Sequence, residues 1–256
     1  MVSKIVVSIV IGVFNEEKLI ARALKSIINQ TYIDWELIVV DDGSTDSSRE
    51  IIKSYASQDN RIILVENKTN LGLAASLNSG ISIARGKYIA RMDADDESLP
   101  HRLERQTAFL DLNPNVDVLG TAALYVDRQG NTIKEIFLKE RHEDILATIL
   151  RACPIIHPSV MMRREFIKMM GGYDDSSRRA EDHDLWLRAR GITKFHNLPE
   201  IHLRYLVSSK LMFATIFDRG LVRLKHSNSI SEYVASIFWS TVDLLVMLRQ
   251  KLKGIK

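Results

Sequence analysis

Residues 7–46, VSIVIGVFNEEKLIARALKSIINQTYIDWELIVVDDGSTD, contain the pattern that decides the fold. The runs 7–14 and 35–40 are mainly apolar and rich in β-branched residues, which predicts two buried strands. The segment between them repeats apolar side chains at the spacing of a helix: Leu19, Ala23, Leu24 and Ile27. The stretch is therefore predicted to form a strand, a helix and a second strand.

The same alternation continues towards the middle of the chain. Helical patterns occupy 46–57 and 73–84, and strand-like runs occupy 61–67 and 86–96. Strands that alternate with helices form a mostly parallel sheet, because each helix returns the chain so that the next strand runs in the same direction. We expect an α/β fold in which helices cover both faces of the sheet.

Polar side chains follow each predicted strand at the point where it ends. Ligands of parallel sheets bind beyond the carboxyl ends of the strands. The residues at these ends are Asn15 and Glu16, Asp41 and Asp42, Asn67 and Asn70, and Asp93 to Asp96. A simple turn with a helix cap uses the same residue types as 41–48, so both interpretations of that segment stay open. We expect the chemistry of the protein at this edge of the sheet.

The composition is that of an ordinary globular protein, with 46% hydrophobic and 26% charged residues among 256. The single cysteine, Cys153, excludes an internal disulfide and favours a cytoplasmic location. A net charge of +3, without an arginine-rich or aromatic-interleaved stripe, argues against nucleic acid as a partner. Residues 1–14 lack the basic start of a signal peptide, and no run reaches the ~20 apolar residues of a membrane span.

The acidic stretch RMDADDESLP, residues 91–100, crowds three carboxylates into one turn. Close carboxylates repel one another unless a cation, hydrogen bonds or water relieves the repulsion. The spacing resembles a calcium loop, but Ser98 replaces the required glycine and Pro100 interrupts the loop. A solvated acidic turn remains open, while the position at the ligand edge favours a divalent cation that binds substrate phosphates. No P-loop or GxGxxG sequence is present to hold a phosphate instead.

Five ordered segments of the chain resemble the family 2 inverting glycosyltransferases of the GT-A fold. They are SIVIGVFNEEKLIARALKSIINQTY (8–32), WELIVVDDGSTDSS (35–48), NLGLAASLNSGISIARGKYIARMDADD (70–96), HPSVMMRREF (157–166) with GGYDD (171–175), and AEDHDLWLRA (180–189). The resemblance implies a Rossmann-like sheet whose first half, 1–98, binds a nucleotide sugar. It also implies that the second half, 99–205, carries the acceptor site and the catalytic base, and that a helical tail follows at 206–256.

The resemblance also implies roles for particular residues on the donor side. Asp93, Ala94 and Asp95 form a DXD motif that is expected to bind Mg²⁺ or Mn²⁺ through Asp95 and Asp93. Asp95 is the expected direct ligand, and Asp93 lies near the ribose and diphosphate. The expected base and ribose pocket consists of Phe14, Glu16 and Asp42, closed by the backbone of Gly12 and Gly72. A carboxylate can accept the N3 hydrogen of uracil, and an aromatic ring can stack on the base. Packing of Phe14 in the core is the alternative.

On the acceptor side the resemblance assigns Asp182 as the catalytic base. A sugar hydroxyl must lose its proton as it attacks, and a neighbouring carboxylate, Glu181 or Asp184, could raise the pKa of Asp182 to suit that task. The acidic residues could instead serve only to start a helix over 181–191. We expect His183 at the surface, and His157 in a structural or supporting position beside the cleft.

Related enzymes often carry a histidine or arginine just beyond the tyrosine that corresponds to Tyr205. Leu206, Val207 and Ser208 occupy these positions here. The alternative cations that could hold the diphosphate are His202, Arg204, Arg178 and Arg179.

The activity that the resemblance implies is metal-dependent, inverting, hexosyltransferase-type transfer from a UDP-linked or other nucleotide sugar. A glycan or lipid-linked hydroxyl acceptor would place the enzyme in polysaccharide, lipopolysaccharide or glycoconjugate synthesis for the cell envelope. A sugar-phosphate nucleotidyltransferase is one alternative, although it needs a glycine-rich basic loop where IGVFNEEK (11–18) is acidic. A binder of nucleotides or carbohydrates without catalytic activity is another.

The tail SEYVASIFWSTVDLLVMLRQKLKGIK, residues 231–256, combines an apolar stretch with a cationic end. The cationic residues are Arg249, Lys251, Lys253 and Lys256. This combination suits a helix that lies on the inner face of a membrane, with its cations near anionic lipid. A helix packed on the catalytic domain or on the partner in a homodimer fits the pattern equally well.

Overall fold

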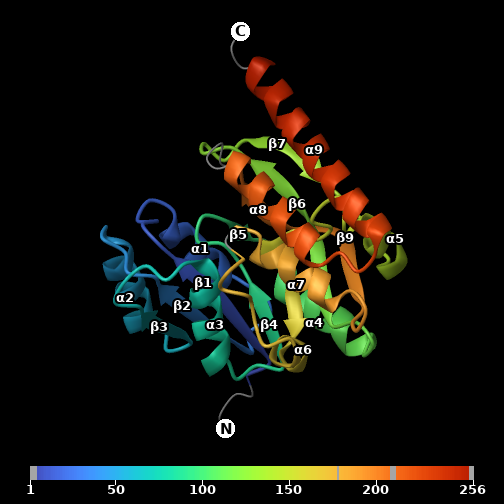
Figure 1. The fold of residues 1–256 in the computed structure, drawn as a ribbon. Helices are drawn as coiled ribbons and strands as arrows, with labels where there is room; N and C mark the ends of the chain where they lie inside the picture. The colour runs from blue at the N-terminus through green and yellow to red at the C-terminus, as the bar shows by residue number, and fades with distance from the viewer. Residues whose placement is uncertain (1–4, 178, 208–211, 254–256) are drawn as a thin grey trace.

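The computed structural model describes residues 5–177, 179–207 and 212–253, and a single sheet with helices on both faces forms its body (Figure 1). The elements of the first half, in chain order, are β1 (Val7–Val13), α1 (Ile20–Ile28), β2 (Trp35–Asp41), α2 (Ser48–Gln58), β3 (Ile62–Glu66), α3 (Leu73–Ile83), β4 (Tyr88–Arg91) and β5 (Glu97–Ser98). The alternation predicted from the sequence is confirmed in this half.

The second half adds shorter helices and four more strands before the chain leaves the sheet. Its elements are α4 (Arg102–Leu112), β6 (Val118–Val126), β7 (Thr132–Ile136), α5 (His142–Thr148), the 3₁₀ helix η1 (His157–Ser159), β8 (Met161–Arg163), α6 (Arg164–Met169), α7 (Glu181–Ala189) and β9 (Phe195–Leu206). Two helices follow, α8 (Met212–Lys225) and α9 (Ile230–Lys253).

The strand order β3-β2-β1-β4-β8-β6-β9-β5 joins both halves in one sheet, with β7 paired to β6. The first four strands in this order are parallel to one another, and β6 is parallel to β9. Strand β8 runs antiparallel between β4 and β6 and links the two parallel parts. The predicted α/β class is confirmed, and the carboxyl ends of β1, β2 and β4 meet at one edge.

Alternate side chains of each buried strand enter two separate cores, one on either face of the sheet. On one face Ile9 and Ile11 pack with the apolar stripe of α1, which is buried at Ile20, Leu24 and Ile27. On the other face the packing side chains of β1, β2, α3, α6 and α7 include Val10, Ile38, Leu77, Phe166 and Trp186. The strands are therefore buried on both sides, as continuous apolar runs in a parallel sheet require.

Gly86, which precedes β4, lies so close to β1 that no side chain fits there. An added Cβ would lie 2.5 Å from the backbone nitrogen of Ser8 and 2.8 Å from the carbonyl carbon of Val7. We expect Gly86→Ala to lower the free energy of unfolding by about 3 kcal/mol, because the backbone of a central strand must move. The matched control is Gly191→Ala, where an added Cβ meets nothing within 4 Å. Denaturant unfolding of both variants checks the prediction, and equal stabilities would contradict it.

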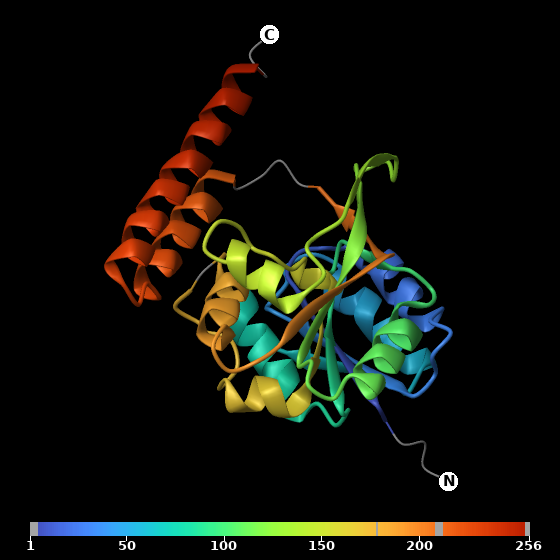
Figure 2. The same ribbon diagram turned by 90° about the vertical axis from the view of Figure 1, so that its right-hand side faces the viewer.

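The last two helices pack side by side as a hairpin, and α9 extends beyond the body of the domain (Figures 1 and 2). The C-terminal end of α8, at the turn of this hairpin, is held to α7 by one buried carboxylate, Asp184. Its oxygens accept hydrogen bonds from Arg188 Nε at 2.7 Å, from Lys225 Nζ at 3.2 Å, and from His226 Nε2 at 2.7 Å. The C-terminal helices are therefore docked on the body of the domain through charged groups as well as apolar ones.

The docking contacts of Asp184 give the hairpin a predictable dependence on pH. Burial alone would raise the pKa of Asp184, but the bonds from His226 and Arg188 outweigh it and lower the pKa to about 2. A lowered carboxyl pKa stabilises the folded protein above pH ~4, and this stabilisation is lost as the pH falls towards 2. We expect Asp184→Asn to lower the stability at pH 7 by about 3 kcal/mol, and the difference from wild type to vanish near pH 2. Unfolding curves of both proteins between pH 2 and pH 7 measure this stability difference. A difference that does not change with pH would contradict the lowered pKa of Asp184.

Candidate active site

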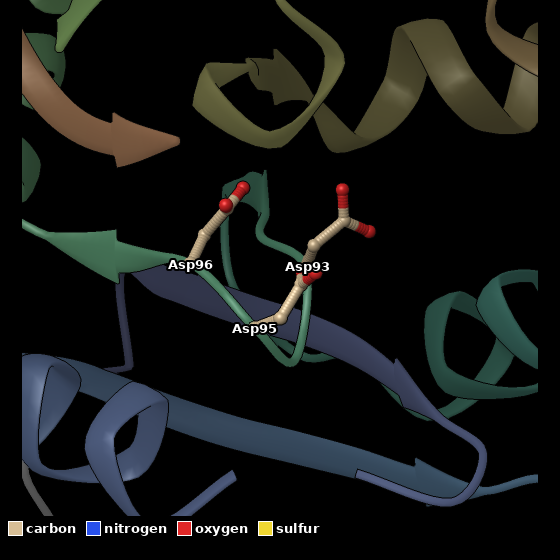
Figure 3. Close-up of side chains that lie close together, drawn as sticks. All are labelled: Asp93, Asp95 and Asp96. Atoms are coloured by element: carbon tan, nitrogen blue, oxygen red, sulfur yellow. The ribbon is translucent and has the colours of Figure 1, made fainter. Parts of the chain in front are cut away.

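The acidic turn between β4 and β5 brings three carboxylates together. The side chains of Asp93, Asp95 and Asp96 each offer an oxygen within 4.8 Å of the others. Figure 3 shows all three on one tight turn, with the carboxylates of Asp93 and Asp96 directed to the same side. Asp96 is an addition to the predicted metal ligands Asp93 and Asp95, although it stands in the same acidic stretch of the sequence.

The environment of each carboxylate in this turn is different. Asp93 is paired with the buried guanidinium of Arg91, whose Nη1 lies 2.9 Å from Oδ2 of Asp93. Burial, together with the charge of Asp93, raises the pKa of Asp95 to about 7. Burial raises the pKa of Asp96 well above its ordinary value, although the backbone N–H of Leu206 donates a hydrogen bond to its Oδ1 at 2.8 Å.

The carboxylate oxygens of the acidic turn are suited to binding a divalent cation. The second oxygen of Asp96, Oδ2, is buried and has no hydrogen-bond partner. A buried, unpartnered carboxylate oxygen is unfavourable unless it receives a positive charge. Hard cations such as Mg²⁺ take oxygen ligands of this kind, so Asp95, Asp96 and Asp93 are suitable ligands in number and type.

The side chain of Asp42, at the end of β2, shapes the loop that precedes α3. Its Oδ1 accepts hydrogen bonds from Asn67 Nδ2 at 2.8 Å and from the backbone N–H of Leu71 at 2.9 Å, and its Oδ2 accepts one from the N–H of Gly72 at 2.8 Å. Gly72 has a φ of 93°, a conformation that favours glycine. Asp42 therefore fixes the backbone of Gly72, and contact of either residue with a nucleotide stays a prediction.

The residues after β1 are directed at the same edge. Phe14 is 44% exposed, so packing in the core does not explain it. Burial and the charges of Asp46 and Asp93 raise the pKa of Glu16, which places Glu16 close to the acidic turn. At Gly12 an added Cβ would lie 3.0 Å from the side chain of Leu73, so β1 and α3 approach closely here.

A cleft of about 420 Å³ lies beyond these strand ends and reaches from the acidic turn to α7. Its charged and aromatic lining residues are Arg91, Asp93, Tyr125, His157, Arg179, Glu181, Asp182, Tyr205 and Arg219. A neighbouring recess is lined by Gly72, Leu73, Arg179 and Glu181. Asp93 and Asp182, from segments far apart in the sequence, therefore face one cleft.

Asp182 lies in the first turn of α7 and is held in place by two donors. The backbone N–H of His183 donates to Oδ1 at 2.7 Å, and the thiol of Cys153 donates to Oδ2 at 3.1 Å. Burial would raise the pKa of Asp182, but the nearby positive charge of Arg219 and the Cys153 bond help lower it to about 2. Burial and the charge of Asp182 instead raise the pKa of Glu181 to about 7. The raised pKa predicted for Asp182 is therefore wrong, and it is the pKa of its neighbour Glu181 that is raised.

The sequence of the chain, compared with models of protein families, matches the model described as glycosyl transferase family 2 over residues 8–170. This range includes the donor-side segments and the acidic turn. The chain belongs to glycosyl transferase family 2.

Named relatives of this family 2 protein extend the similarity towards the C-terminus. An uncharacterized glycosyltransferase of Methanocaldococcus jannaschii, MJ1057, is 36% identical over 92% of this chain and 80% of its own length. The O-antigen biosynthesis glycosyltransferase WbnJ of Escherichia coli is 30% identical over 80% of this chain and 80% of its own length.

Solved structures confirm the GT-A architecture of this family 2 member. Residues 1–349 of Staphylococcus aureus TarS, in complex with UDP-GlcNAc, superpose with a TM-score of 0.71 at 20% identity, over 93% of this chain and 71% of that one. The mannosyltransferase PcManGT of Pyrobaculum calidifontis, in complex with GDP-Man and Mn²⁺, gives 0.66 at 18% identity, over 95% of this chain and 75% of that one. At these identities the likeness shows the fold alone.

The cations predicted to replace the family's histidine or arginine lie in different places. Arg204 is 3.5 Å from the carboxylate of Glu97, and His202 is buried on β9 outside the cleft lining. Arg178 lies outside the described residues, whereas Arg179 lines the cleft. The sequence prediction missed Arg219 of α8, which lines the same cleft from beyond the resembling segments.

Three other side chains near α7 correct the sequence prediction or refine it. Asp184 does not face Asp182, because residues two apart point to different sides of a helix, and it binds Arg188 and the hairpin instead. His183 is buried and not at the surface, with Nε2 2.7 Å from the carbonyl oxygen of Ile149. His157 is 2.8 Å from the Tyr173 hydroxyl, in a supporting position behind Glu181.

Proposed function

We propose that this family 2 protein is an inverting glycosyltransferase that moves a sugar from a nucleotide diphosphate sugar to a hydroxyl acceptor. The observation that carries the proposal is that the acidic turn, through Asp93, and the candidate base Asp182 face one cleft from different segments. An inverting displacement needs the leaving group and the base on opposite faces of the sugar. A cleft between these two groups suits that arrangement.

On the donor side, residues 1–98 bind the nucleotide sugar. The exposed ring of Phe14 stacks on the base, and Glu16 and Asp42 accept hydrogen bonds from the base and ribose. Gly12 and Gly72 let the backbone approach the ligand closely. UDP is the proposed nucleotide, a choice supported by the UDP and UDP-GlcNAc complexes of TarS.

The proposed ligands of Mg²⁺ or Mn²⁺ are Asp93 and Asp95, the two aspartates that flank Ala94 in the DXD motif, together with Asp96. The bound cation would neutralise the negative charge that develops on the departing nucleoside diphosphate. The Mn²⁺ in the PcManGT complex supports this choice of cofactor.

On the acceptor side, Asp182 takes the proton of the attacking hydroxyl. The hydroxyl oxygen bonds to the anomeric carbon as the bond from that carbon to the diphosphate oxygen breaks, so the configuration inverts. The bonds from Cys153 and His183 hold the Asp182 carboxylate in one orientation, which saves the entropy of aligning it during reaction. Residues 99–205 thus form the acceptor and catalytic-base half of the domain.

Incubation with a panel of nucleotide sugars and Mn²⁺ tests the proposal, with a mixture of monosaccharides and glycosides as acceptors. Release of nucleoside diphosphate with inverted product is expected. Release of pyrophosphate from a nucleoside triphosphate and a sugar phosphate would show a nucleotidyltransferase. Binding of nucleotide sugars without turnover of any of them would show a binding protein.

The tail at 206–256 also bears on location, and we place it on the cytoplasmic face of a membrane. The sequence prediction that no run could span a membrane is corrected here, because the window Ile230–Met247 of α9 is long and apolar enough to cross one by length and composition, and only 11% of it is buried. Its exposed apolar side chains include Val234, Ile237, Phe238, Leu245 and Val246. Such a surface favours a lipid-linked or cell-envelope glycan as acceptor.

We expect the protein to sediment with anionic vesicles at low salt, and Leu245→Glu together with Val234→Glu to reduce the bound fraction at least about tenfold. Both side chains are exposed, so the substitutions should leave the thermal unfolding temperature unchanged. Wild-type protein that stays in the supernatant would contradict membrane contact. In that case, if the wild-type protein is a dimer and the same substitutions dissociate it, the exposed apolar surface of α9 binds a second copy of the chain.

A further inference from the structure

Helix α8 brings a positive charge into the catalytic cleft from the C-terminal hairpin. Arg219 lines the cleft together with Asp182, while the neighbouring Asp218 accepts a hydrogen bond from Arg179 at 3.0 Å. Lys225, on the same helix, is bound to Asp174 and Asp184. Ion pairs at two points therefore fix α8 over the cleft and set the position of Arg219.

The guanidinium of Arg219 can donate a further hydrogen bond and form an ion pair. Its Nε is buried and has no hydrogen-bond partner, and within the described ranges no carboxylate lies within 4.0 Å of it to form an ion pair. Arginine stays charged in proteins, and a partly buried guanidinium with an unpaired N–H is unfavourable. An oxyanion that enters the cleft would satisfy this group.

The position of Arg219 points to the acceptor and not to the donor diphosphate. Helix α8, which carries Arg219, packs against α7, which carries Asp182 in its first turn. The acidic turn has a cation of its own, because Nη1 of the buried Arg91 lies 2.9 Å from Oδ2 of Asp93. Arg219 thus belongs to the Asp182 side of the cleft, where the attacking hydroxyl must lie.

The wall beside Arg219 suits a sugar ring. The rings of Tyr125 and Tyr205 have their centroids 4.8 Å apart and line the same cleft, and Ile136 and Leu138 add an apolar surface. Aromatic faces pack against the apolar face of a pyranose, while an arginine binds its charged substituent in a fork.

We propose that Arg219, Tyr125 and Tyr205 form an acceptor subsite for a glycan that carries an oxyanion, either a phosphate or a carboxylate. The proposal rests on the proposed function, because it assumes that the acceptor hydroxyl meets Asp182. Glu181 and Asp182 alone would repel an acidic acceptor. The positive charge of Arg219 reverses this effect, so the cleft selects acidic acceptors over neutral ones.

Binding of three probes to the whole protein, saturated with UDP and Mn²⁺, tests the subsite. The probes are methyl glucoside 6-phosphate, methyl glucuronide and neutral methyl glucoside, measured by calorimetry or ligand-observed NMR. We expect one of the charged probes to bind at least about tenfold more tightly than the neutral one. The stronger of the two identifies phosphate or carboxylate.

Substitutions distinguish recognition of the acceptor charge by Arg219 from a role in UDP binding and from a general effect of charge. Arg219→Gln is expected to remove the preference for the charged probe and to leave UDP binding within about twofold, while Arg219→Lys keeps part of the preference because it keeps the charge. Arg249→Gln, on an exposed position of α9, is the matched control for general charge and should change nothing.

Equal affinities for all probes in the wild type, or an unchanged preference in Arg219→Gln, would overturn the proposal. Weaker UDP binding in Arg219→Gln would also overturn it, by placing Arg219 at the donor diphosphate. Thermal unfolding of each variant separates these outcomes from misfolding. Failure of the protein to bind any nucleoside diphosphate would refute the proposed function. The relative affinities of the three probes test the acceptor subsite separately.

Discussion

Replacement of Asp182 by asparagine should leave donor binding intact and lower kcat at least about 100-fold, the scale of losing a positioned base. The amide has almost the same shape as the carboxylate, so its oxygen can still accept the hydrogen bond from the N–H of His183. It cannot take the acceptor proton. Nucleoside diphosphate release at saturating donor, together with calorimetry of UDP binding, measures the two effects separately.

The matched control for that substitution is Asp184→Asn, two residues further along α7 and on another side of the helix. It removes a carboxylate of the same helix that binds Arg188, Lys225 and His226. We expect it to lower stability while kcat falls much less. If Asp182→Asn retained its kcat, the base would have to be another group, and Glu181→Gln would be the next variant to measure.

Replacement of Asp95 by alanine should abolish turnover and remove the dependence of UDP binding on Mn²⁺. Asp95 forms no ion pair with any residue in the described part of the chain, and its raised pKa reflects burial and repulsion from Asp93. Its loss should therefore cost no stability, so thermal unfolding without metal should match wild type. Calorimetry with UDP, with and without Mn²⁺, measures the binding.

Substitutions at two neighbouring residues serve as comparisons for Asp95→Ala. Asp93→Ala should also lower the unfolding temperature, because Arg91 is only 3% exposed and would lose its carboxylate partner. Glu97→Gln is the control, since Glu97 pairs with Arg22 and Arg204 and lies just after the acidic turn. Binding of UDP that stays fully Mn²⁺-dependent in Asp95→Ala would show that the cation has other ligands.

The sequence by itself determined the parallel part of the sheet, from β1 to β4, and its ligand edge. Periodicity is a local property, so the buried run of β1 and the apolar stripe of α1 could be read without knowing what they pack against. The acidic turn is equally local, because Asp93, Asp95 and Asp96 are neighbours in the chain. Even the separation of Asp184 from Asp182 follows from helical spacing, although the sequence prediction left it open.

Only the tertiary structure decided the electrostatics of the site. Cys153 meets Asp182 across 29 positions in the sequence, and Leu206 meets Asp96 across 110. Arg219 enters the cleft because α8 folds back over α7 and is held there by Asp184 and Arg179. Burial would raise the pKa of Asp182, but the charge of Arg219 and the hydrogen bond from Cys153 help lower it to about 2, opposite to the shift predicted from its neighbour Glu181. A charge acts through space, so no local pattern in the sequence could reveal which distant cation would stand beside the carboxylate.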